Sequence, residues 1–114
     1  MGSALDYMVD DLTRAERYEV ERHKYFLSRE RGYDVGFEMA RNDWLEHHAP
    51  AWRRRRQQHM LELQRQEIQR YKWIASQHAQ RDLGREAVME WIQRYAAQWR
   101  DWYEREYTRV EDEA

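Results

Sequence analysis

The chain has 114 residues, the length of a single domain, and its charged residues sum to a formal net charge of −2. This balance excludes a general attraction to nucleic acid or acidic membranes, so such a partner would need a local basic patch. The absence of cysteine excludes disulfides, thiolate zinc sites and cysteine nucleophiles.

The composition favours helices. Only four Gly and one Pro are present, which is typical of long helices and not of a sheet with many turns. Six Trp, eight Tyr and two Phe can supply a core with few aliphatic side chains. No apolar run reaches the ~18 residues of a membrane-spanning helix, and no signal-peptide pattern opens the chain. We therefore expect a cytoplasmic, all-α protein with no membrane partner.

Apolar residues at helical spacing predict a first helix near residues 4–31. This helix should end at Gly32, because glycine adopts the positive φ of a helix end without a clash at Cβ. Asp34 is the expected N-cap of a second helix near residues 35–48, since its carboxylate can accept a backbone N–H of the first turn.

Pro50 leaves two interpretations open for the middle of the chain. A break at His48 would be followed by a new helix near residues 51–79, because helices usually end before the residue that precedes proline. A single kinked helix over about residues 35–79 also fits the pattern. A last helix near residues 83–110 carries a wide aromatic stripe.

One stretch of the sequence occurs twice, in residues 14–53 and again in residues 62–100. The offset between the copies is 48 residues, and it becomes 47 after a one-residue deletion. The identical pairs are Glu19/Glu67, Arg22/Arg70, Lys24/Lys72, Ser28/Ser76, Asp34/Asp82, Gly36/Gly84, Glu38/Glu86, Trp44/Trp91, Ala49/Ala96, Trp52/Trp99 and Arg53/Arg100. The pattern indicates an internal duplication of a ~48-residue helical hairpin, too small to bury a core alone.

Lysine usage singles out one position of this repeat. The chain has 18 Arg but only two Lys, which occupy the matched positions Lys24 and Lys72, each four residues before a Ser. One hypothesis is a corner clamp, in which the lysine packs under an aromatic ring and bonds the Asp or the carbonyls of the turn. The other is an anion site, although the Asp carboxylate argues against it. The corner residues are Lys24, Ser28, Asp34 and Gly36, and Lys72, Ser76, Asp82 and Gly84.

Tryptophans recur eight residues apart, which places each pair along one face of a helix. Aromatic residues at this spacing are typical of a core or an interface. The residues expected in these roles are Trp44, Trp52, Trp91, Tyr95, Trp99 and Trp102.

Arg53, Arg54, Arg55 and Arg56 form the strongest basic run and are candidates for phosphate contacts. Four consecutive helical residues span about 300° of the circumference, so they cannot all face one groove. This geometry favours a solvated helix over a nucleic-acid site.

The five histidines are His23, His47, His48, His59 and His78, and none lies in a Glu-x-x-His or His-Glu-x-x-His pattern. A metal site would need residues from another helix, so neither a metal nor a cofactor is predicted. No catalytic motif is recognisable, and an enzyme is the least supported class.

These observations predict a single all-α domain, residues 1–114, ending in an acidic tail at 111–114 that frays. It is either a small helical bundle or a kinked long central helix with the outer helices folded back. The predicted function is a non-enzymatic interaction or scaffold protein, a homodimer that binds another protein through helical aromatic surfaces. The alternative is a module that binds an anion or nucleic acid through the lysine corners or the arginine run.

Overall fold

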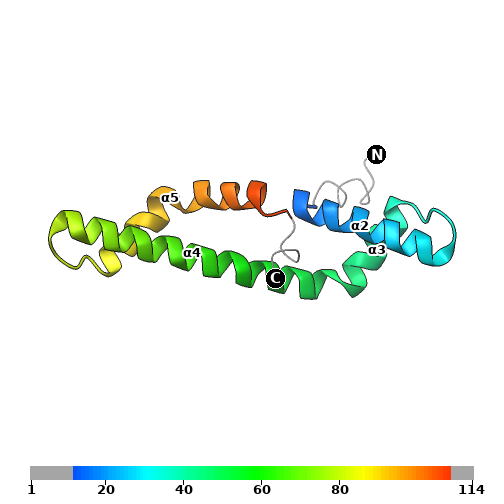
Figure 1. Cartoon of the computed structure of the whole chain (residues 1–114), viewed down its shortest axis with the longest axis horizontal. Coiled ribbons are helices and arrows are strands. Elements are labelled where there is room, and N and C mark those ends of the chain that lie inside the picture. Colours follow the sequence, from blue (N-terminus) through cyan, green and yellow to red (C-terminus); the bar gives the residue numbers. More distant parts are fainter. Residues whose placement is uncertain (1–11, 109–114) are drawn as a thin grey trace, which may run out of the picture. The chain divides into compact units, whose positions relative to one another are not determined.

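The computed structural model describes residues 12–108, which form four helices and no strand (Figure 1). The all-α prediction is confirmed for these residues. The helices are α2 (Arg14–Arg31), α3 (Phe37–His47), α4 (Ala49–Ala79) and α5 (Arg85–Glu106). The expected start of the first helix, at residues 4–11, and the tail at 111–114 lie outside the described residues.

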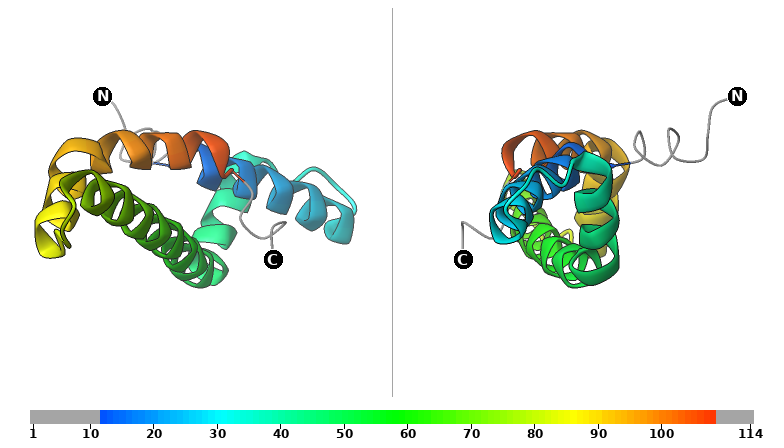
Figure 2. Two further views of the ribbon diagram at one scale, coloured as in Figure 1. Left: turned by 60° about the vertical axis from the view of Figure 1, so that its left-hand side comes forward. Right: turned by 90° about the vertical axis from the view of Figure 1, so that its right-hand side faces the viewer.

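The chain divides into two compact units. Of the described residues, unit 1 contains 12–54 and 107–108, and unit 2 contains 55–106. In unit 1, α2 and α3 pack against each other and are joined by a corner at residues 32–36. In unit 2, α5 folds back along α4 after a corner at residues 80–84 (Figures 1 and 2).

Helix α2 begins with a capping box. The Thr13 Oγ1 accepts a hydrogen bond from the Glu16 N at 3.1 Å, and the Thr13 N donates to Glu16 Oε1 at 3.0 Å. The expectation of one continuous helix over residues 4–31 is therefore wrong, because extended backbone at Thr13 separates α2 from what precedes it. The expected stop at Gly32 is confirmed, since Gly32 has φ +81° and its N donates to the Ser28 O at 2.9 Å.

The helical conformation is interrupted between α3 and α4 at His48, which has φ −122°. Proline has no N–H to donate to the carbonyl four residues earlier, so α3 cannot continue through Pro50 unchanged. Pro50 lies instead in the first turn of α4, where no such donor is required. The break is therefore the alternative that is observed, and the single kinked helix is not.

The core of unit 1 is built around two tryptophans from different helices. Trp44 on α3 and Trp52 on α4 are each 3% exposed, and their rings meet edge to face with centroids 5.5 Å apart. Small or branched side chains fill the space beside the rings. The buried members of this core are Ala15, Val20, Ala40, Trp44, Ala49 and Trp52.

Unit 2 is held together near the end of α5 by Tyr103, which is fully buried. The Tyr103 hydroxyl donates to the Arg56 carbonyl at 3.4 Å and lies 2.8 Å from His59 Nδ1. The Arg56 guanidinium lies over the Tyr103 ring, 4.9 Å from its centroid, and donates to Glu104 at 3.1 Å. These contacts join α5 to α4 at the end of the unit opposite the corner.

The capping box supports a prediction about stability. Replacing Thr13 by Ala removes the acceptor for the Glu16 N, and we expect the free energy of unfolding to fall by about 1 kcal/mol. Urea denaturation followed by circular dichroism measures the change. Thr13→Ser keeps the hydroxyl and is the matched control, with stability close to that of the unmodified chain; an equal loss in both variants would contradict the capping role.

Candidate functional site

The two corners repeat the same serine hydrogen bond. Ser28 Oγ accepts the Val35 N at 3.1 Å, and Ser76 Oγ accepts the Leu83 N at 3.1 Å. Helices α2 and α4 end 48 positions apart, and α3 and α5 begin 48 positions apart. Each serine thus holds the chain that leaves its corner against the last turn of the helix that enters it.

The aspartates also act alike in the two corners. Asp34 Oδ1 accepts the Gly36 N at 3.0 Å, and Asp82 Oδ1 accepts the Gly84 N at 3.0 Å. This side-chain turn precedes the helix, and Gly36 is the N-cap of α3, with no side-chain cap bond. The prediction of Asp34 as the N-cap was therefore wrong by two residues, because the carboxylate closes the turn and not the first helical turn.

Positive φ occurs twice in each corner. Gly36 and Gly84 have φ of +83° and +53°, and the matched residues Gly32 and Gln80 have φ of +81° and +58°. Glycine adopts this conformation freely, whereas a residue with a Cβ is strained there by about 1–2 kcal/mol. Gln80 therefore bears strain that Gly32 does not.

Both lysines line a hollow at their corner, but neither pairs with the corner aspartate among residues 12–108. The Lys24 Nζ lies 3.8 Å from the Glu21 carboxylate. The residue that matches Glu21 is Gln69, and Lys72 has no ion pair within the described range. The lysine–aspartate bond expected of the clamp is thus replaced by the serine and aspartate bonds to the backbone.

The hollows themselves are matched. The one in unit 1 has a volume of about 660 Å³, and the one in unit 2 about 690 Å³. Each is bordered by an exposed aromatic side chain, Tyr25 at 58% and Trp73 at 65%. All eight lining positions correspond at the 48-residue offset: Glu21/Gln69, Lys24/Lys72, Tyr25/Trp73, Ser28/Ser76, Arg29/Gln77, Gly32/Gln80, Tyr33/Arg81 and Asp34/Asp82.

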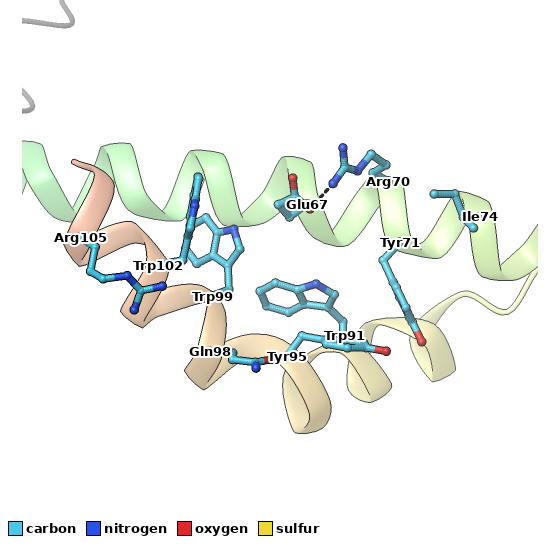
Figure 3. Close-up of a pocket in the computed structure, with 10 residues that line it drawn as sticks. All are labelled: Glu67, Arg70, Tyr71, Ile74, Trp91, Tyr95, Gln98, Trp99, Trp102 and Arg105. Carbon is cyan, nitrogen blue, oxygen red and sulfur yellow. Dashed lines mark hydrogen bonds and ion pairs between the residues drawn. The ribbon is translucent and has the colours of Figure 1, made fainter.

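A third concave surface, the aromatic groove, lies between α4 and α5 in unit 2 (Figure 3). Its volume is about 530 Å³. Trp91 is 4% exposed, whereas Tyr95 and Trp102 are 38% and 39% exposed. The lining residues are Glu67, Arg70, Tyr71, Ile74, Trp91, Tyr95, Gln98, Trp99, Trp102 and Arg105.

Charged residues border this groove. The Tyr71 hydroxyl donates to Glu90, and this bond to a carboxylate raises the pKa of Tyr71 to about 12. Arg70 donates to Glu67 at 2.9 Å on the α4 side. Arg105 stands at the opposite end from Tyr71 (Figure 3) and forms no ion pair within the part of the chain that the structure describes.

The arginine run does not present a common surface. Arg53 donates to the buried Glu16 at 2.6 Å, and Arg56 is 7% exposed and bound to Glu104. Arg54 and Arg55 are exposed. Two of the four guanidiniums are therefore committed to contacts within the chain, which weakens the case for a phosphate-binding stripe.

A histidine cluster that the sequence did not predict lies in unit 1. Asp43 Oδ2 is 2.6 Å from His23 Nε2, and Asp43 Oδ1 is 3.1 Å from His47 Nδ1. The His23 hydrogen bond lowers the pKa of Asp43 below its ordinary value. The His48 ring centroid is 4.7 Å from that of His23. The four-residue spacing of Asp43 and His47 is a sequence signal, but His23 comes from another helix.

No protein-family model matches the chain, and no curated protein or solved structure is significantly similar to it. Within residues 12–108, none of the helices combines the length and apolar character needed to cross a membrane.

The matched positions 32 and 80 support a prediction by reciprocal exchange. Gln80→Gly should raise the free energy of unfolding by about 0.5–1 kcal/mol. Glycine removes the strain of the left-handed conformation, and this gain exceeds the extra conformational entropy that glycine loses on folding. Gly32→Gln should lower the free energy of unfolding by a similar amount for the same reason. Thermal and urea denaturation of both variants measure the changes, and a change of the same sign in both would contradict the equivalence of the two corners.

Proposed function

We propose that this protein is a non-enzymatic scaffold that self-associates through the aromatic groove. The observation that supports it is the partial exposure of Tyr95 and Trp102 at the edge of a concave surface, where a partner can cover both. In this proposal the described helices act by shape and apolar contact, and the bound partner is a second copy of the chain.

The exposed aromatic area at the groove is large enough to contribute measurably to the free energy of self-association. A tryptophan buries up to ~250 Å². Because Trp102 is 39% exposed, covering it would remove on the order of 100 Å² from water in each copy. At ~25 cal/mol per Å² this contributes about 2.5 kcal/mol per copy, and a symmetric dimer gains it twice.

The charges around the groove suit a second copy related by a two-fold axis. Arg105 lies at one end of the groove, and Tyr71 lies toward the other (Figure 3). The Tyr71 hydroxyl donates a hydrogen bond to Glu90. An antiparallel arrangement brings Arg105 of each copy toward Glu90 of the other. Such a surface is self-complementary, as an isologous interface requires.

We further propose that the scaffold arose by internal duplication of a helical hairpin. The matched serine and aspartate bonds, the equal spacing of the helix ends and the eight corresponding positions of the hollows support this. In this account each repeat unit within the chain supplies one corner, and the two repeat units differ in how their tryptophans are covered.

The scaffold proposal predicts a dimer that depends on the groove. Trp102→Ala should weaken self-association by on the order of 1,000-fold or more, because the ~2.5 kcal/mol that the ring contributes is lost from both copies of the interface. Size-exclusion chromatography with light scattering, over a concentration series and at moderate salt, measures the mass.

Trp73→Ala is the matched control, since Trp73 is an equally large, exposed ring in unit 2 that lies outside the groove. The control should leave the dimer intact. A monomer at every concentration of the unmodified chain, or an equal loss in both variants, would contradict the proposal.

One observation favours a second candidate function, the binding of small anions at the two hollows. Each hollow contains a lysine at a matched position, and Lys72 has no ion pair among the described residues. The carboxylate of Asp34 or Asp82 in each hollow would repel an anion bound there. For this reason the scaffold remains the favoured function.

Titration with inorganic phosphate tests the second candidate. If it holds, amide resonances of both corners shift in nuclear magnetic resonance spectra, and Lys72→Gln removes the shifts of the unit 2 corner alone. Arg54→Gln, an exposed cation outside the hollows, should change neither set. Spectra that phosphate leaves unchanged would reject anion binding.

A further inference from the structure

The histidine cluster of unit 1 has the donor set of a transition-metal site. His23 is on α2, Asp43 is on α3, and His48 is the residue between α3 and α4. One ligand atom from each of these three residues lies within 4.8 Å of the others. We propose that His23, Asp43 and His48 bind a divalent transition-metal ion of the zinc type.

The chemistry of the three side chains fits such an ion. Imidazole nitrogen and carboxylate oxygen are preferred ligands of Zn²⁺, which binds them at about 2.0–2.2 Å. Tetrahedral coordination at that length separates ligand atoms by about 3.3 Å. The His23 and Asp43 atoms, now 2.6 Å apart, would move apart slightly, and His48 would move inward. Three protein ligands leave one position for water.

The surroundings hold the ligands in place without closing the site. The His23 side chain is 19% exposed and the Asp43 side chain 29% exposed, so both are partly fixed by packing and still reachable from solvent. His47 lies against the second Asp43 oxygen at 3.1 Å and is a positioning residue for the carboxylate. A bound ion would join α2, α3 and the break at His48 in one contact.

A hydrogen-bonded His–Asp pair with no affinity for metal is the competing explanation. Calorimetric titration of the full chain with zinc chloride alone separates the two. We expect one Zn²⁺ per chain and a higher melting temperature when zinc is present.

His48→Ala is the first variant to test, because His48 is exposed and its loss should leave the fold intact, as circular dichroism can verify. It should lower zinc affinity roughly tenfold or more. His23→Gln should do the same, and its folding is checked in the same way.

His78→Ala is the matched control, since His78 is an exposed histidine on α4 outside the cluster. It should bind zinc as the unmodified chain does. The proposal is overturned if no zinc binds, or if His48→Ala binds as tightly as His78→Ala, because the metal would then be held elsewhere on the surface.

Discussion

The turn of the chain at each corner is the constraint on which the rest of the structure depends. A helix that ends leaves backbone groups without partners, and the residues that follow must find new ones within a few positions. Here a serine of the last helical turn and an aspartate of the corner accept two consecutive backbone N–H groups. These bonds set where α3 and α5 begin, and so which of their faces is turned toward the preceding helix.

The same eight-residue tryptophan spacing occurs in a buried core in unit 1 and beside an open groove in unit 2. In unit 1 the break at His48 puts Trp44 and Trp52 on different helices, and both are buried. In unit 2 no proline interrupts α5, so Trp91 and Trp99 remain on one helix with ring centroids 6.2 Å apart. Trp91 is buried there, but Trp99 is only half-buried and Trp102 is exposed. The closed pair therefore spans a helix break beside a proline, and the more open pair lies on an uninterrupted helix.

Local chemistry made the helices and the stop at Gly32 accessible from the sequence, because each depends on residues within a turn of one another. Pro50 marked the place where the helix could break or kink, and the sequence left both alternatives open; the break at His48 is the one observed. The corner residues were also identified, but not their contacts. Asp34 was expected to cap α3 but bonds the Gly36 N of the corner. Lys24 was expected to bond the aspartate or the carbonyls of the turn, but its ammonium lies near Glu21, and Ser28 accepts a backbone N–H of the corner. The groove and the histidine cluster depend on packing between helices. His23 and Asp43 are 20 residues apart, and no periodicity connects them.

The central claim is that the aromatic groove is covered by a second copy of the chain. Hydroxyl-radical oxidation of aromatic side chains, read by mass spectrometry at low and high protein concentration, tests it in the unmodified protein. The account predicts that oxidation of Trp102 and Tyr95 slows as concentration rises, while that of Trp73 stays constant. Equal rates for Trp102 at both concentrations would contradict it.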